Sequence, residues 1–414
     1  MDWHDAELTY TETRTIESAL GDRPMEIITR PGFPDWDEVS QAERLLAAHA
    51  AVSAGQQVLI WPCGHGALGL WAAEHTEPQH IALRDTNAIA TEMARRTCDE
   101  NELSAIDVQA AMPEPESVDI ALMTLPKGRD LARLMLLAAA RAVRRGGQLY
   151  LAGANRAGIK SVAGDAEELL GPGRLLAYKG GNRILRYTCE ADLAEEQLPE
   201  SFRAPGIPAG TYHEIEVTID EARQEDTATY RLSTRPGAFS WEHLDQGTAL
   251  LLSTVRARDD EQLLDVGCGY GIIGIHLGQQ APQGRATLVD VDLLACECAE
   301  RNVERYDLAH AEVWHGDALE RLGENAYSLI VSNPPFHSGH GISVDMTRAL
   351  IHQAHDALER NGRLVLVANR FLAYDVAMDE RFGNVTTLVE TPQFHVLEAY
   401  KRHQRGSRRR SRRR

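Results

Sequence analysis

The residues with the clearest chemical meaning are Asn333-Pro334-Pro335-Phe336, which follow an apolar run from Tyr327 to Val331. Proline has a fixed φ and no N–H to donate, so the two prolines hold the carbonyls of Asn333 and Pro334 outward at the end of the expected strand. The Asn333 side-chain oxygen and the Pro334 carbonyl can then accept both hydrogens of a planar amino group, while Phe336 stacks on the attached ring. The nitrogen lone pair then points out of the plane, as methyl transfer to nitrogen requires.

A glycine-rich turn upstream could hold the methyl donor. The apolar stretch Leu263 to Val266 runs into Gly267-Cys268-Gly269-Tyr270-Gly271, and alternate glycines let a backbone turn tightly and approach a ligand. NAD and FAD sites use similar turns, so the glycines alone are weak evidence. Asp265 precedes the first glycine, where a carboxylate would repel a pyrophosphate but accept from the ammonium of an amino acid. This position favours a nucleoside that carries an amino acid.

Two further acidic residues end the next expected strands. Asp290 follows the glycines by about 20 residues and can accept both ribose hydroxyls. Asp317, in His315-Gly316-Asp317-Ala318, can receive an adenine amino group. Contacts for an amino acid, a ribose and an adenine, without a phosphate site, describe S-adenosylmethionine; the plainer alternative is that these acids only cap helices. The predicted cofactor-binding residues are Asp265, Gly267, Gly269, Gly271, Asp290, Asp317, Ala318 and Asn333.

The elements that must position these residues alternate between strand and helix patterns, which indicates a parallel sheet covered by helices. The alternation runs to about Glu190 and returns from Glu261 to Tyr400. Before it, the sequence predicts a strand over 25–29, a Pro/Gly turn over 30–34 and a helix from Trp36 to about His49. Alternating residues over 213–219 and after Thr227 predict a hairpin that leads into Arg235-Pro236-Gly237.

The two halves repeat each other. Residues 57–69 lie over 262–274, and Ala154-Asn155-Arg156 matches Ala368-Asn369-Arg370. Together with the equal spacing from Cys63 to Asp85 and from Cys268 to Asp290, and the match of residues 123–127 to 332–336, these make four matched points in the same order. They indicate one duplicated α/β domain rather than chance similarity of glycine turns. The first copy has Ile60 and Pro62 in place of Asp265 and Gly267, and Thr124-Leu125-Pro126 in place of Asn333-Pro334-Pro335. We therefore expect the first copy to be catalytically dead.

The predicted domain organisation has four parts. Residues 1–190 form a degenerate methyltransferase-like domain for RNA recognition or stabilisation, residues 191–210 a linker, residues 211–400 the catalytic domain and residues 401–414 a basic tail. A chain of 414 residues is long enough for two domains with proper cores. The predicted fold class is α/β, with two tandem Rossmann-like domains, each a mostly parallel seven-stranded sheet with helices on both faces.

Composition and charge limit the location and the partners. No apolar run reaches the roughly 18 residues of a membrane span, the N-terminus is acidic, and six scattered cysteines indicate a reduced, cytoplasmic protein. The net charge is −18, but the tail carries nine Lys/Arg and no acid, which leaves 34 basic against 61 acidic residues elsewhere. The chain without its tail is therefore much more acidic than a general nucleic-acid-binding protein. The tail suits RNA phosphates, and its alternative role is to aid solubility.

The second half resembles the ribosomal RNA guanine-N2 methyltransferases of the RsmC/RlmG type, in the class I methyltransferase fold with a "methyltransferase small" domain. The resemblance covers essentially residues 210–400. It lies in Gly237-Ala238-Phe239-Ser240, Leu244-Asp245-Gln246-Gly247-Thr248, Leu264 to Gly269, Ser332 to Gly339, Val367 to Tyr374 and Phe394-His395-Val396, and a further stretch from Gly153 to Ser161 resembles the family in the first half.

The resemblance implies S-adenosylmethionine as donor and a guanine N2 in ribosomal RNA, most simply the 16S RNA, as acceptor. It places Asn333, Pro334 and Phe336 in the catalytic motif, with Phe336 and His337 as substrate contacts. It also implies that Asp265, Gly267, Gly269, Asp290 and Asp317 contact the donor. The first half departs from the family outside its one matching stretch, and the body is unusually acidic; both leave the RNA target open.

Three alternatives stay open from the residues themselves. Asn-Pro-Pro-aromatic suits any planar amine or amide, so a protein glutamine or an adenine N6 are rival acceptors. A non-enzymatic RNA-binding assembly factor would fit the first half and the tail, but not the intact acids of the second. His352 and His355 share a helical face, yet no carboxylate or cysteine completes a ligand set with the nearby histidines, so we expect no metal. The chain is expected to be a monomer.

Overall fold

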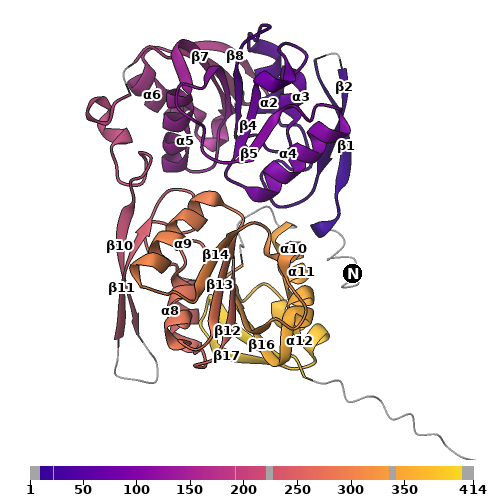
Figure 1. The fold of residues 1–414 in the computed structure, drawn as a ribbon, viewed down its shortest axis with the longest axis vertical. Helices are drawn as coiled ribbons and strands as arrows, with labels where there is room; N and C mark the ends of the chain where they lie inside the picture. Colours follow the sequence, from indigo (N-terminus) through magenta and orange to yellow (C-terminus); the bar gives the residue numbers. More distant parts are fainter. Residues whose placement is uncertain (1–9, 22, 192, 221–226, 335–341, 403–414) are drawn as a thin grey trace, which may run out of the picture.

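The computed structural model describes residues 10–21, 23–191, 193–220, 227–334 and 342–402. Two similar α/β units follow one another along the chain, the first drawn in indigo to magenta and the second in orange to yellow in Figure 1. The elements of the first unit are β1 (Arg14–Leu20), β2 (Arg23–Thr29), α2 (Gln41–His49), β3 (Val58–Trp61), α3 (Ala67–Ala72), β4 (Ile81–Asp85), α4 (Ala88–Glu100), β5 (Asp107–Ala110), β6 (Val118–Thr124), α5 (Arg129–Ala142), β7 (Val143–Ala154), α6 (Ile159–Leu170), β8 (Arg174–Lys179) and β9 (Asn182–Thr188). Short 3₁₀ turns cover Pro78–His80, Asn155–Ala157, Glu195–Gln197 and Glu200–Phe202.

The second unit repeats this order and adds one short helix, α10, between β14 and β15. Its elements are β10 (His213–Asp220), β11 (Thr227–Thr234), α7 (Gln246–Thr254), β12 (Gln262–Val266), α8 (Ile272–Gln280), β13 (Arg285–Asp290), α9 (Leu293–Arg305), β14 (Ala311–His315), α10 (Ala318–Arg321), β15 (Tyr327–Ser332), α11 (Ile342–Ala357), β16 (Leu358–Asn369), α12 (Tyr374–Phe382), β17 (Val385–Glu390) and β18 (Phe394–Tyr400).

Both seven-stranded sheets have the same strand order. The first runs β5-β4-β3-β6-β7-β9-β8 and the second β14-β13-β12-β15-β16-β18-β17. In each, five strands are parallel and the last two are antiparallel to their neighbours. The predicted fold class is confirmed.

Each sheet is covered on both faces, because successive strand residues enter different cores. In β3, Val58 and Ile60 pack into one cluster, while Leu59 and Trp61 pack into another. In β12 the same alternation separates Leu263 from its neighbour Leu264. Full coverage of the faces leaves the carboxyl ends of the parallel strands as the place where polar side chains can gather.

The duplication begins earlier than the glycine turns indicate, because the hairpin β1–β2 corresponds to β10–β11. Thr29-Arg30-Pro31-Gly32 is identical to Thr234-Arg235-Pro236-Gly237. The two threonine hydroxyls donate to equivalent carbonyls, Thr29 to Trp36 (2.5 Å) and Thr234 to Trp241 (2.6 Å). The predicted hairpin over 213–234 is present as β10 and β11. Its counterpart, β1–β2, lies before the strand–helix alternation from which the sequence analysis inferred the first repeat.

Two local expectations change in the structure. The first helix begins at Gln41 rather than Trp36, because Ser40 forms a capping box with Glu43. The stretch expected to be a linker packs against the first unit, where Leu198 and Phe202 are buried in its core. None of the described helices has the length and apolarity of a membrane-spanning segment.

The two units contact each other through equivalent turns, residues 86–88 after β4 in the first unit and residues 291–293 after β13 in the second. The Ala88 amide donates to the Val291 carbonyl (2.9 Å), and the Leu293 amide donates to the Thr86 carbonyl (2.8 Å). Asn87 faces Asp292 in an antiparallel bridge between them. Because these residues are equivalent in the duplication, the contact is pseudo-two-fold, and Figure 1 shows its consequence: the hairpins β1–β2 and β10–β11 lie on opposite flanks.

Candidate active site

Asn333 lies directly after β15, at the carboxyl edge of the second sheet. β12 and β15 are neighbours in register, with Val266 opposite Ser332, and the Ser332 hydroxyl donates to the Val266 carbonyl (2.7 Å). The next residue on each strand is Gly267 and Asn333, respectively. The structure therefore brings the proposed acceptor residue beside the glycine turn, as the sequence predicted.

The Asn333 amide is held in one orientation. Its Nδ2 donates to Asp245 Oδ2 (3.0 Å) and to Thr248 Oγ1 (2.8 Å). An ionised carboxylate can only accept, so the NH₂ group must face Asp245 and the Oδ1 atom must face away from it. The half-buried side chain thus presents an acceptor toward the carboxyl edge.

Asp245 and Thr248 anchor this amide to the start of α7. Asp245 is the N-cap of that helix, and its Oδ2 also accepts from the Thr248 amide (3.0 Å). In the sequence, Leu244–Thr248 stands out only as part of the family resemblance, and neither residue was assigned a role. The capping pattern Asp-x-x-Thr was visible there, but its contact with Asn333 spans more than eighty positions and has no local signal.

Pro334 is described and buried, whereas Pro335, Phe336 and His337 lie outside the described residues. The stacking role of Phe336 and the substrate contact of His337 stay predictions. Pro334 keeps its predicted place next to Asn333 at the strand end.

The glycine turn has the backbone that its sequence predicted. Gly267 and Gly269 adopt left-handed φ angles of 70° and 56°, and a Cβ at either position would meet no atom within 4 Å. A Cβ at Gly271 would instead lie 3.1 Å from Ala299 and 3.2 Å from Leu288. The first two glycines therefore border open space, while Gly271 allows α8 to pack closely against its neighbours.

Asp265 has one engaged and one unengaged oxygen. Its Oδ2 accepts from the Gly274 amide (2.8 Å), whereas the buried Oδ1 has no partner among the described residues. Burial raises the pKa of the Asp265 carboxyl to about 7, and the nearby Asp290 carboxylate adds to the rise. A buried acceptor without a donor suits a cationic group such as an ammonium.

Asp290 fastens the glycine turn to the end of β13. Its two oxygens accept from the amides of Gly269 (2.9 Å) and Asp292 (3.0 Å), and burial raises its pKa. Asp85 does the same in the first unit, where it accepts from Gly64 (3.1 Å) and Asn87 (3.0 Å). The acid thus has a structural task in both copies, and its second lone pairs remain for the predicted ribose contact.

Asp317 joins the two units. It is the N-cap of α10, where Oδ1 accepts from the Leu319 amide (3.0 Å). Its Oδ2 accepts from the buried Arg30 of the first unit (2.9 Å), which also pairs with Glu320 (2.6 Å). Ala318, the first residue of α10, is buried beside it. The predicted adenine contact therefore sits on a helix start that a side chain of the other repeat holds in place.

The first unit lacks the corresponding donor features. Ile60 occupies the position of Asp265, and the next residue, Trp61, is fully buried with its indole N–H donating to the Met135 carbonyl (3.1 Å). Pro62 replaces the first glycine. These residues provide an apolar core and no acceptor for an ammonium, which supports the expectation of a dead first copy.

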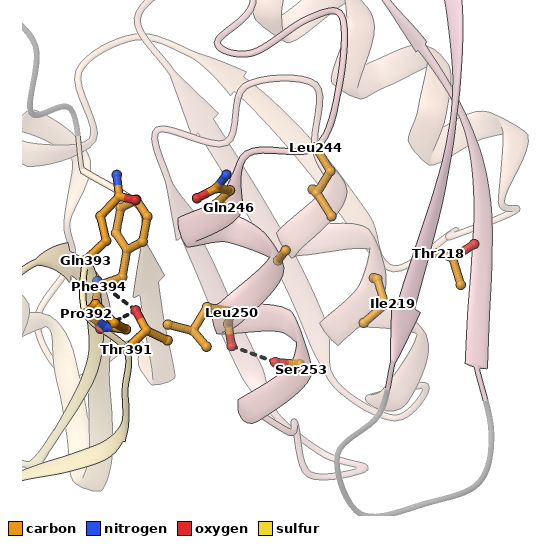
Figure 2. A pocket seen from close by; sticks show the side chains of 11 residues that line it. Thr218, Ile219, Leu244, Gln246, Leu250, Ser253, Thr391, Pro392, Gln393 and Phe394 are labelled. Atoms are coloured by element: carbon orange, nitrogen blue, oxygen red, sulfur yellow. Dashed lines mark hydrogen bonds between the residues drawn. The ribbon is translucent and has the colours of Figure 1, made fainter.

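A groove lies on another face of α7 from Asp245 and Thr248. It has a volume of about 640 Å³ and is lined by uncharged residues of α7, the β10–β11 hairpin and the β17–β18 turn. Figure 2 shows Gln246 and Gln393 at one end of this groove and Ser253 farther along α7. Phe394 packs beside Gly247, so the groove borders the helix start that holds Asn333.

Comparison with known proteins gives the family. The model of the methyltransferase small domain matches residues 24–186 and again residues 229–398. The chain belongs to the methyltransferase small domain family. The double match confirms the tandem arrangement inferred from the sequence, and the predicted enzyme class, a methyltransferase, is confirmed with it.

Relatives within this family share most of the chain. "Ribosomal RNA small subunit methyltransferase C" of Stutzerimonas stutzeri is 33% identical over 286 residues, 69% of this chain and 80% of that protein. The protein of the same name from Actinobacillus succinogenes is 32% identical over 71% of this chain and 81% of its own length. A solved structure of the T. thermophilus 16S rRNA N2 G1207 methyltransferase (RsmC), in complex with AdoMet and guanosine, superposes with a TM-score of 0.74 at 25% identity and covers 96% of this chain and all of that one. The predicted RsmC-type relationship is confirmed.

Proposed function

We propose that this methyltransferase transfers a methyl group from S-adenosylmethionine to the exocyclic N2 of a guanine in 16S ribosomal RNA. The observation that carries the proposal is the fixed Asn333 amide, whose oxygen faces the carboxyl edge beside the glycine turn. The RsmC-type relatives are named for small-subunit ribosomal RNA, and the solved relative holds AdoMet and guanosine. Site geometry and relatives point to the same acceptor.

The donor fits the residues present. S-adenosylmethionine, when bound, supplies a methyl group activated by a sulfonium. Asp265, with its orphaned buried oxygen, would hold the ammonium, while Asp290 would accept the ribose hydroxyls and Asp317 with Ala318 would border the adenine. Gly267 and Gly269 provide the open space beside which a ligand can lie.

The chain's own residues orient the acceptor. Asn333 Oδ1 and the Pro334 carbonyl accept the two N2 hydrogens, so the plane of the base is fixed and the nitrogen lone pair points out of it. Asp245 and Thr248 prevent the Asn333 amide from rotating, because rotation would place its oxygen against a carboxylate. Phe336 stacks on a base that has left its helix. Positioning supplies the rate enhancement, and the surplus proton on N2 leaves to water after transfer.

The remaining parts of the chain have supporting roles in this proposal. The first unit, residues 1–190, performs no methyl transfer, and residues 211–400 carry the reaction. The basic residues of 401–414 contact RNA phosphates, which removal of residues 403–414 would test through a smaller salt dependence of RNA binding.

The proposal is tested with radiolabelled donor offered to unmodified 16S RNA, to small ribosomal subunits and to a peptide release factor. We expect label in a methylguanine of the RNA, and no label with Asn333→Ala. Label in the release factor alone, or in adenine, would refute the guanine assignment in favour of the rival acceptors. Donor binding by calorimetry distinguishes an inactive preparation from a non-enzymatic protein, which would bind no donor.

A further inference from the structure

The first unit carries a block of positive charge on an otherwise acidic chain. Residues 131–164 and 171–189 contain ten lysines and arginines and no aspartate or glutamate. Outside the tail the chain has 34 basic against 61 acidic residues, so this segregation is strong. Local charge of this kind governs which polyanion a surface attracts, even when the whole protein is acidic.

Part of this charge gathers at the carboxyl edge of the first sheet. The backbone N–H of Asn155 donates to the Gly181 carbonyl (2.8 Å), so the β8–β9 turn lies beside the end of β7. The Leu125 amide donates to the Ala152 carbonyl (2.9 Å), which places the segment after β6 next to the same end. These contacts bring together what we call the basic edge: Lys127, Arg156, Lys160, Tyr178, Lys179 and Arg183.

The cations of the basic edge are available for a partner. Lys127, Arg156, Lys160 and Lys179 are exposed, and Arg183 is half-buried. Within the part of the chain that the structure describes, none of the five cations is paired with a carboxylate. α6 also begins there on Gly158, which offers no side-chain acceptor to the first amides of this 12-residue helix. Free cations and an uncapped helix start both favour phosphate.

An aromatic ring is fixed among these cations. Arg183 Nε donates to Asn155 Oδ1 (2.9 Å), and its guanidinium lies 5.1 Å from the Tyr178 ring centre. The side-chain Nδ2 of Asn155 donates to the Tyr178 hydroxyl (3.4 Å). The ring is nevertheless 59% exposed. A rigid, exposed aromatic beside phosphate-binding cations is the combination on which unpaired bases stack.

One cation of the basic edge differs from its counterpart in the catalytic unit. Arg370 is the counterpart of Arg156 in the repeated Ala-Asn-Arg stretch, and it pairs with Glu390 at 2.6 Å. The duplicated position is therefore neutralised in one copy and free in the other. Figure 1 places α6, which begins at the basic edge, on the flank opposite α11 of the catalytic unit, so the edge is separate from the reacting site.

We propose that the basic edge binds the phosphate backbone of the ribosomal RNA substrate, with Tyr178 stacking on an unpaired base. This inference rests on the proposed function. It assigns the degenerate copy a task at the very edge where the second copy carries out transfer. The RNA must extend across the contact between the two units to reach the carboxyl edges of both sheets.

The test uses the full chain and an unmodified 16S RNA transcript in filter binding from 50 to 300 mM KCl. The edge triple variant is Lys127→Gln/Arg156→Gln/Lys179→Gln. The control triple variant, Arg145→Gln/Arg174→Gln/Arg203→Gln, removes three exposed charges from outside the edge. We expect the edge variant to lower the slope of log K against log salt by about 2 to 3, roughly one for each lost phosphate contact, and the control by less than one. Tyr178→Ala should weaken binding about tenfold with an unchanged slope.

Donor affinity by calorimetry and the thermal midpoint serve as checks of folding, and neither should differ from the parent. An edge variant with the slope and affinity of the parent would overturn the inference, as would a control variant that loses as much. If the parent methylates the RNA while the edge variant binds normally, only this inference fails. If the parent neither binds nor methylates the RNA, the proposed function fails as well.

Discussion

Donor affinity should depend on pH through Asp265. The pKa of this carboxyl is about 7 in the free protein because of its burial, and its unengaged oxygen is the expected partner of the donor ammonium. If only the ionised form binds, the ionised fraction is about one half at pH 7 and about 3% at pH 5.5. Affinity should therefore fall about 16-fold between these values. The donor's own ammonium stays protonated in this range, so it does not contribute.

Isothermal calorimetry from pH 5.5 to 7 in buffers of different ionisation enthalpy measures this directly. About half a proton should be released per donor bound at pH 7, and nearly one at pH 5.5. Asp265→Asn should weaken binding at pH 7 by about 10- to 100-fold, the worth of a charge-assisted hydrogen bond, and should flatten the profile. Asp292→Asn is the matched control, because burial and Asp290 raise its pKa to about 7 as well, whereas its carboxylate caps α9 and accepts from the Thr86 hydroxyl (3.0 Å), so both of its oxygens are engaged.

The same carboxyl links pH to stability. Its folded pKa lies above its unfolded value of 3.8, so the stability it contributes is present below pH 3.8 and is lost as the pH rises through about 7. The donor-free protein should therefore lose stability between about pH 4 and pH 7, and the Asp265→Asn variant should lose less. A parent whose donor affinity is constant from pH 5.5 to 7, or a variant with the parent's profile, would refute this account of the donor site.

Two further substitutions test the geometry around the site. Thr248→Val removes one of the two acceptors that hold the Asn333 amide, so kcat should fall about tenfold with donor affinity unchanged, as expected for loss of one hydrogen bond of about 1.4 kcal/mol in the oriented state. Thr254→Val is the control, because the Thr254 hydroxyl donates only to a helix carbonyl. Equal losses of kcat in the two variants, measured by rapid quench, would count against the role of Thr248. Arg30→Met leaves Asp317 buried without its cation, so the free energy of unfolding in urea should drop by about 3 to 5 kcal/mol and donor binding should weaken; a variant as stable as the parent would show that the pair contributes no net stability.

The fold of the second unit is well predicted from the sequence, because the informative residues lie in short, locally constrained segments. A strand that ends in Asn-Pro-Pro and a strand that ends in alternating glycines each predict their own backbone. Their meeting then follows from sheet topology, since β12 and β15 are neighbours. The repeated strand, glycine turn and helix indicate the same doubly wound arrangement in both halves.

The support of the site could not be read in the same way. Asp245 reaches Asn333 and Arg30 reaches Asp317 across long sequence separations, and nothing in the local pattern of either partner indicates the other. The start of the repeat was missed although Thr-Arg-Pro-Gly occurs twice, because the glycine turns give the clearer match. The stretch expected to be a linker, residues 191–210, packs against the first unit, because Leu198 and Phe202 belong to the core of that unit. Such long-range packing has no signal in the local sequence.

The pseudo-two-fold contact explains which residues are kept in the first unit, which we expect to be catalytically dead. Ile60 stands where the second unit has Asp265, so we expect Asp85 to contact no donor, yet Asp85 still accepts from the amides of Gly64 and Asn87. Those bonds shape the turn from Thr86 to Ala88, and that turn donates to and accepts from the equivalent turn behind Asp290. A copy that lost Asp85 would disturb the partner's donor site, whereas a copy that lost Asp265 would disturb only its own. The expected loss of catalysis in the first repeat is therefore compatible with retention of its turn, because the turn contacts the other repeat.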